Sequence, residues 1–157
     1  MADHKVDKVL KLFISQSGTS DRFEREVIAL DGGGVVEDKF HNKNSQRSVL
    51  IASTASYNLV SIYGIEMPFG YLGENILLDF NPYNLEIGTK IKIGDVILEI
   101  SQQCTICNHL GVIDVKIPTL LKNDRGIFAK VISGGEIKVD DDVYILQEQI
   151  KTTSNSR

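Results

Sequence analysis

Residues 88–107, GTKIKIGDVILEISQQCTIC, decide how this chain folds. Apolar and polar residues alternate on both sides of Gly94-Asp95. Alternation with a period of two indicates half-buried strands, and a two-residue connection containing glycine is typical of a β-hairpin. The second strand leads directly into Cys104 and Cys107, the two cysteines of the chain. The sequence therefore predicts a hairpin that carries both thiols to the rim of a sheet, where functional groups are often found.

Short strand-like segments recur along the chain, separated by glycine or aspartate turns: 6–15, 23–30, 47–51, 76–79, 90–93, 96–102, 126–133 and 137–146. The clearest helix is expected to begin at Ser53 or Thr54, both good N-caps, and to stop at Gly64. A shorter helix is expected over 117–122, with Pro118 in its first turn. A β-α-β rhythm is missing, which argues against a Rossmann or P-loop enzyme. We predict a mostly β (α+β) fold, a barrel-like antiparallel sheet with a few peripheral helices.

The composition is that of one globular domain of 157 residues, 42% of them hydrophobic and 24% charged. A net charge of −4 argues against a nucleic-acid partner, and no apolar run approaches the ~20 residues needed to cross a membrane. The first residues carry no signal-peptide pattern. We therefore expect a cytoplasmic protein with a single domain over 8–148, a flexible N-terminus over 1–7 and a disordered tail over 149–157.

The first candidate site is the polar stretch 37–47, which reads as an exposed loop. It contains Asp38, His41 and Arg47. A guanidinium offers a planar fork of donors and an imidazole a switchable donor or acceptor, so the three residues suit an anion or a cofactor. The alternative is a solvated loop whose charges bind nothing in particular.

The second candidate is the turn before the 76–79 strand, where Gly73, Glu74 and Asn75 follow one another. Glycine lets a backbone approach a ligand closely, and the next two side chains add an acceptor and an amide. Glycine and asparagine also enter turns for local backbone reasons alone, so an ordinary turn remains the alternative.

The cysteine pair is the third candidate. Cys104 and Cys107 have the spacing of a redox dithiol or of half a zinc site, and one of them can be a nucleophilic thiol. A zinc site would need His109 and perhaps His41 to complete it, and a redox dithiol usually opens a helix in a β-α-β unit. Both cysteines can also be small buried hydrophobes.

Taken together and in order, these segments resemble the MOSC domain, the module named for the C-terminal part of eukaryotic molybdenum-cofactor sulfurase. The resemblance covers roughly 8–146, and its most specific pieces are Gly73-Glu74-Asn75-Ile76 and the hairpin that leads to Cys107. The weaker pieces are the opening strand 9–15, the loop 38–41, the strand 47–51, and the segments 125–131 and 134–141. The resemblance implies a small stand-alone member of this family.

MOSC proteins are thought to carry sulfur as a cysteine persulfide, or to bind molybdenum cofactor and reduce N-hydroxylated compounds. Pyridoxal phosphate is implied only at the level of the family. The resemblance makes Cys107 the working thiol and the metal ligand, with Cys104 as a second, resolving thiol. It also implies a sulfur donor such as a cysteine desulfurase. The chain departs from the family where Cys104 stands in place of a basic residue and Glu37 in place of a glycine.

For the cofactor, the resemblance implies a binding set made of Asp38, His41, Arg47, Gly73, Glu74 and Asn75. The leading hypothesis is thus sulfur transfer or cofactor binding through Cys107, as a sulfur transferase or a molybdenum-cofactor-dependent reductase. The alternative is a non-catalytic accessory module with the same barrel. A single concave pocket lined by the charged members of this set and Cys107 would favour the first hypothesis, and a scattered set the second.

Overall fold

The structure is a computed structural model that describes residues 3–18, 22–104 and 114–147. Within these ranges it has twelve strands, two α-helices and one 3-10 helix. The strands are β1 His4–Lys8, β2 Lys11–Ser15, β3 Arg22–Arg25, β4 Val27–Asp31, β5 Gly34–Val35, β6 Val49–Ser53, β7 Ile76–Leu78, β8 Lys90–Ile93, β9 Val96–Gln103, β10 Ile127–Ser133, β11 Gly135–Lys138 and β12 Asp142–Ile145. The helices are α1 Thr54–Ile62, α2 Ile117–Leu120 and the 3-10 helix η1 Ser45–Arg47.

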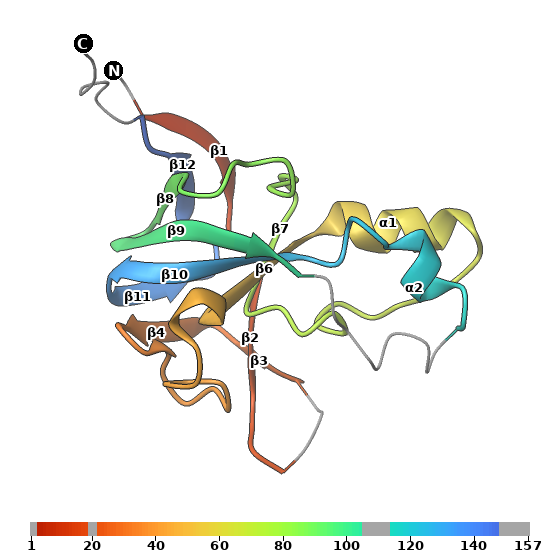
Figure 1. The fold of residues 1–157 in the computed structure, drawn as a ribbon, viewed down its shortest axis with the longest axis horizontal. Helices are drawn as coiled ribbons and strands as arrows, with labels where there is room; N and C mark the ends of the chain where they lie inside the picture. The colour runs from red at the N-terminus through yellow and green to blue at the C-terminus, as the bar shows by residue number, and fades with distance from the viewer. Residues whose placement is uncertain (1–2, 19–21, 105–113, 148–157) are drawn as a thin grey trace.

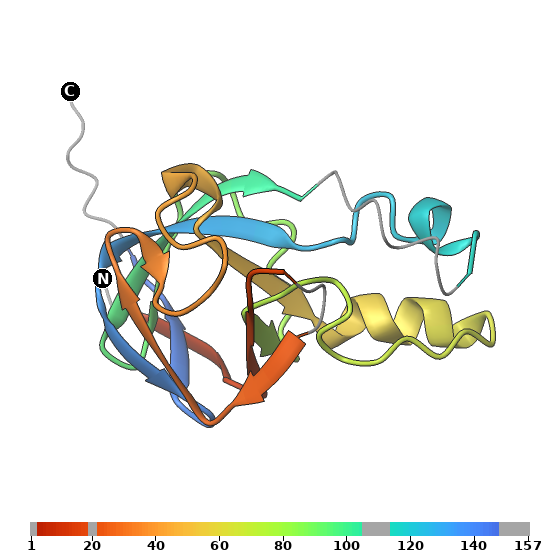
Figure 2. The same cartoon turned by 90° about the horizontal axis from the view of Figure 1, so that it is seen from below.

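Nine strands form one sheet in the order β1-β12-β8-β9-β10-β6-β7-β2-β3. The pairing of β6 with β7 is parallel, and the other pairs in this sheet are antiparallel. A second sheet has the order β11-β4-β5. The strands curl around one end of the molecule, and the two α-helices lie together at the other end (Figures 1 and 2). The predicted mostly β, barrel-like fold with few helices is therefore confirmed.

The predicted hairpin is formed by β8 and β9, with Ile93 opposite Val96 across the turn. Gly94 has φ 57°, a left-handed conformation that glycine adopts without a steric penalty. The alternating side chains Ile91, Ile93, Val96, Leu98 and Ile100 are buried. Their burial explains the register, because a shift by one residue would move this set to the other face of the sheet.

Two apolar clusters share the main sheet. The larger lies inside the curl and includes Ile14, Ile28, Ile51 and Ile127. The smaller lies between the other face and the helices, where Phe13, Ala52 and Leu77 pack with Tyr57 and Val60 of α1 and with Ile117 of α2. The sheet is thus buried on both faces where β2, β6 and β7 lie, and α1 and α2 pack against this part of its outer face.

Helix α1 begins as predicted. The Ser53 hydroxyl accepts a hydrogen bond of 3.0 Å from Ala55 N, the usual N-cap arrangement. The helix ends at Ile62, and the predicted stop residue Gly64, which has φ 78°, follows the C-cap Tyr63. Helix α2 has Pro118 in its first turn and ends at Leu120, slightly earlier than the predicted 117–122. In the described part of the chain no helix combines the length and the apolar character needed to span a membrane.

Some predicted segments are divided differently. The stretch 6–15 forms two strands, because Val9 N bonds to Asp141 O whereas Leu10 N bonds to Leu77 O, so that the chain changes partners. The stretch 23–30 divides into β3 and β4, which belong to different sheets. Part of the expected flexible N-terminus, 4–7, lies in β1, which pairs with β12. The single-domain boundaries stay a prediction, and the tail 149–157 lies outside the described residues.

Candidate functional site

Strand β9 carries the cysteine segment along the edge of β10. Gln103 lies opposite Ile127, and Cys104 N then donates a hydrogen bond of 3.0 Å to Gly126 O, which continues the ladder. Cys104 is buried, with 5% of its surface exposed. Cys107 and His109 lie outside the described residues. The ladder therefore leads to within three residues of Cys107.

A β-bulge shapes the end of β9. Phe128 of β10 lies opposite Gln102, whereas the next residue, Ala129, lies opposite Ile100, so Ser101 has no opposite residue. Bulges bend a strand and redirect the side chains that follow, and they occur often beside functional sites. The Ser101 hydroxyl donates a hydrogen bond to Gln46 O in η1. The bulge thus connects the end of β9 to the loop that carries Arg47.

Arg47 lies over the outer side of the same strands. Its guanidinium carbon is 5.0 Å from the centre of the Phe128 ring, a cation–π contact. Its Nε is buried and has no hydrogen-bond partner, and none of the ion pairs found within the described ranges includes Arg47. Because Phe128 is opposite Gln102, this cation lies beside the last residues of β9.

A buried tyrosine connects the end of β9 to the start of α1. Gln103 Nε2 donates a hydrogen bond of 2.6 Å to Tyr83 O, and the Tyr83 hydroxyl accepts one of 2.8 Å from Ser53 N. The same hydroxyl is 2.7 Å from Ser56 Oγ. Burial raises the pKa of Tyr83 to about 12, so this hydroxyl stays protonated at neutral pH. No sequence signal pointed to Tyr83, because its role depends on contacts between distant segments.

Most of the loop 37–47 is exposed as predicted, but Asp38 within it is buried. One carboxylate oxygen accepts hydrogen bonds from Ser15 N at 2.8 Å, from Ser15 Oγ at 3.0 Å and from Asn75 Nδ2 at 3.2 Å. The other accepts from Phe40 N at 3.0 Å. Such bonds replace the water that a buried carboxylate loses. Asp38 therefore anchors its loop to the end of β2.

Asn75 extends the sheet just before β7 begins. Its side-chain oxygen accepts a hydrogen bond of 3.1 Å from Leu50 N, and its amide donates one of 3.2 Å to Phe13 O. Its own backbone also bonds to Leu50 O and to Phe13 N. The residue thus bridges β6 and β2 and contacts Asp38, so two predicted site residues meet here.

Glu74 points toward α1. It is fully buried, and its Oε2 accepts hydrogen bonds from the Tyr57 hydroxyl at 2.6 Å and from Gly70 N at 3.1 Å. Oε1 is buried without a hydrogen-bond partner. Burial raises the pKa of Glu74, and burial together with the nearby Glu74 raises the pKa of Tyr57. The carboxyl therefore joins the turn before β7 to the helix.

Gly73 lies beneath an arginine that the sequence did not indicate. Its φ is 91°, and a Cβ at this position would be 2.9 Å from Arg22 Nη2. Only glycine fits both the backbone conformation and this approach without adjustment. Arg22 also lies close enough to oppose the rise in the pKa of Glu74. A lone arginine at the start of a short strand carries no sequence signal that would have identified it.

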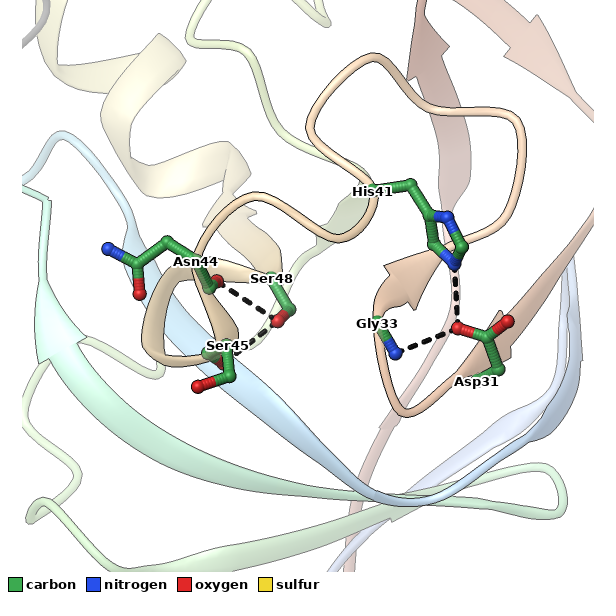
Figure 3. Close-up of polar contacts among 6 residues, drawn as sticks. All are labelled: Asp31, Gly33, His41, Asn44, Ser45 and Ser48. Carbon is green, nitrogen blue, oxygen red and sulfur yellow. Dashed lines mark hydrogen bonds and ion pairs between the residues drawn. The ribbon is translucent and has the colours of Figure 1, made fainter.

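His41 lies against the β4–β5 turn. Its Nε2 donates a hydrogen bond of 2.7 Å to Asp31 Oδ1, which also accepts one of 2.8 Å from Gly33 N (Figure 3). These two bonds, the one from His41 first, lower the pKa of Asp31. Nearby, the Ser48 hydroxyl donates hydrogen bonds to two backbone oxygens, those of Ser45 in η1 and of Asn44 just before η1 (Figure 3).

The predicted set is thus divided. Asp38 and Asn75 are in direct contact, and Gly73 and Glu74 precede Asn75 in the chain. Arg47 lies on Phe128, and His41 lies on Asp31, which the sequence analysis also missed. Whether the set forms one pocket with Cys107 stays a prediction. Within the described ranges, no group of three or more His, Cys, Asp or Glu side chains is arranged to hold a metal ion.

The MOSC domain family model matches residues 37–144, more than half of the chain, so the chain belongs to the MOSC domain family. The predicted family is therefore confirmed. A search of curated proteins found no match.

Solved structures show the same fold. YuaD from Bacillus subtilis has a TM-score of 0.78 at 17% identity, over 94% of this chain and 100% of that chain. YiiM from Geobacillus stearothermophilus has a TM-score of 0.73 at 14% identity, over 90% and 76% of the two chains. YiiM from Escherichia coli has a TM-score of 0.65 at 16% identity, over 88% and 70%.

Proposed function

We propose that this MOSC protein carries sulfur as a persulfide on Cys107. The observation that supports the proposal most is the ladder from β9 to β10, which continues through Cys104 N and Gly126 O and leads into the segment with Cys107. A rigid strand fixes where the segment begins. A thiol that follows such a strand is better positioned for transfer than one on a long free loop.

The transfer needs no net oxidation. The Cys107 thiolate attacks the outer sulfur of a donor persulfide, R–S–SH, and the donor's S–S bond breaks as a new S–S bond forms. The products are the Cys107 persulfide and the donor thiolate, so one sulfur atom moves and charge is conserved. Exchange of this kind requires a thiolate as nucleophile. A cysteine desulfurase is a suitable donor, because it presents sulfur in this form.

Arg47 and Cys104 have supporting roles in this proposal. A cation near a thiol favours the thiolate, and Arg47 lies beside the end of β9 and is in none of the ion pairs of the described residues. The Cys104 thiolate can attack the inner sulfur of the Cys107 persulfide. That step forms a disulfide and releases hydrosulfide, so both cysteines are oxidised and the carried sulfur is reduced.

The test is the intact mass of anaerobically purified protein after incubation with glutathione persulfide. We expect a gain of about 32 Da, one sulfur atom, that dithiothreitol removes. Cys107→Ser should abolish the gain. Cys104→Ser is the matched control and should retain it, with slower release of sulfide. A gain that survives Cys107→Ser, or no gain in folded wild-type protein, would contradict the proposal.

A second candidate is binding of molybdenum cofactor, with which MOSC proteins are associated. Among the described residues, the buried Nε of Arg47 suits an anionic oxygen of such a group, because it has no hydrogen-bond partner in the protein. The polar atoms of Asp38 and Asn75 already bond to the protein, so these residues would act by holding their loops. Cys107 would provide the soft ligand.

When bound, the cofactor supplies two-electron redox chemistry suited to reducing N-hydroxylated compounds. Elemental analysis separates this candidate from sulfur transfer. Stoichiometric molybdenum in wild-type protein that is lost in Cys107→Ser would support the reductase. Neither metal nor carried sulfur in well-folded protein would favour the accessory module with the same barrel.

A further inference from the structure

A hollow lies at the seam between the two sheets. It has a volume of about 260 Å³ and is bordered by β2 and β3 of the nine-stranded sheet and by β4 and β11 of the three-stranded sheet. In the larger sheet, β3 is separated from β9 by β10, β6, β7 and β2. The hollow is therefore a different place from the end of β9, where the cysteine segment begins.

The floor of the hollow is apolar and rigid. Val27 and Ala29 alternate with the buried Ile28 along β4, so they face away from the core and form this floor with Val36. Ile14 and Ile28 border the hollow from the core, with only 3% and 2% of their surfaces exposed. Because core packing holds Ile14 and Ile28, the strands that carry the floor are fixed before any ligand arrives.

Three charged side chains line the rest of the hollow. Arg25 Nη1 pairs with Glu37 Oε1 at 3.2 Å. Glu136 lies on β11 opposite Ala29, which also lines the hollow. None of the ion pairs found in the described part of the chain includes Glu136. One cation and two carboxylates give the rim a net charge of −1, which favours a cationic ligand.

Glu37 adopts a backbone conformation that a glutamate rarely takes. Its φ is 75°, in the left-handed region where glycine and asparagine are comfortable. Among the residues that the structure describes, the other two non-glycine residues with positive φ are Asn42 and Asp140, both of types that tolerate this region. Glu37 lies on the rim of the hollow in this conformation, and strained residues of this kind often mark binding sites.

We propose that this hollow is a binding site for a small organic cation, a primary ammonium on a short aliphatic body. The ammonium pairs with Glu136 and Glu37, and the aliphatic body covers Val27 and Val36. A volume of about 260 Å³ lies just below the usual range for drug-sized ligands, so nucleotides and peptides are too large. The site is independent of the proposed sulfur transfer.

The test is a titration of ¹⁵N-labelled full-length protein, at constant ionic strength and pH, with three probes of equal length: n-pentylammonium, 1-pentanol and pentanoate. We expect saturable shifts for n-pentylammonium at the backbone amides of Ala29, Val36 and Glu37. The neutral and anionic probes should bind at least about threefold more weakly, as expected when one partly exposed charge pair is lost.

Two variants and a control make the result specific. Glu136→Gln removes the charge and keeps the shape, and it should weaken n-pentylammonium binding about threefold. Ala29→Leu fills the hollow from an exposed position of β4 and should abolish binding. Glu66→Gln, an exposed change beyond α1, should leave binding as in wild type. Equal or tighter binding of either control probe, unsaturable shifts, or wild-type affinity in Glu136→Gln would overturn the proposal.

Discussion

Asn75→Ala should destabilise the protein strongly, although it removes only a small polar side chain. The side chain bonds to Leu50 N, Phe13 O and Asp38 Oδ1 at 3.1, 3.2 and 3.2 Å, and all three bonds are buried. Alanine leaves two backbone groups without partners, and an unsatisfied buried group costs about 1–3 kcal/mol. We therefore expect the free energy of unfolding to fall by about 3 kcal/mol.

Urea denaturation followed by circular dichroism measures this change. With a slope of about 2 kcal/mol per molar urea, the midpoint should fall by about 1.5 M and the slope should be unchanged. Asn58→Ala, at an exposed position of α1, is the matched control and should alter the free energy of unfolding by less than about 0.5 kcal/mol.

Asn75→Asp separates the donor from the acceptor. The new carboxylate still accepts from Leu50 N, but it replaces a donor that lies 3.2 Å from Asp38 Oδ1. Repulsion between the two carboxylates should make this variant less stable than Asn75→Ala at neutral pH, with the difference shrinking in acid. A loss below about 1 kcal/mol in Asn75→Ala would refute the idea that Asn75 joins β6 to β2.

Three further changes test other parts of the site. The raised pKa of Glu74 means that the native state holds a proton more tightly, so wild type loses stability as pH rises above 4.5. Glu74→Gln lacks this loss of stability. The amount by which its urea midpoint falls below that of wild type should therefore narrow from pH 5 to pH 8. Because the pKa of Asp31 is lowered, its contact with His41 contributes fully above about pH 3.8 and is lost in acid. Asp31→Asn should therefore be less stable than wild type at pH 7, and the two unfolding curves should converge as the pH falls below 3.8. Arg47→Gln should lower the free energy of unfolding by only about 0.5–1 kcal/mol, the size of a cation–π contact. It should also slow alkylation of Cys107 by iodoacetamide. An unchanged rate would show that Arg47 does not favour the thiolate of Cys107.

Local patterns predicted much of the fold. The Gly94-Asp95 turn and the N-cap at Ser53 are signals contained in a few neighbouring residues, and both are confirmed. The division of 23–30 between two sheets was not predicted, because no glycine or proline stands at or beside Glu26, where the chain changes sheets. The change of partner depends on contacts with β2 and β11.

The chemistry around the predicted site residues was less accessible to sequence reasoning. Asp38 looks like a ligand-binding carboxylate, but its oxygens bond to β2 and to Asn75. His41 bonds to Asp31, ten residues earlier in the chain, and Gly73 lies against Arg22 of β3. These pairs depend on how the loops pack against one another in three dimensions, and the spacing of residues along the sequence does not determine that packing.

The measurement that tests the central claim most directly is tandem mass spectrometry of the peptide containing Cys104 and Cys107, after loading with glutathione persulfide and trapping by alkylation. The account predicts an additional mass of about 32 Da on Cys107 and none on Cys104 in wild-type protein. The added sulfur on Cys104, or an equal division between the two thiols, would contradict it.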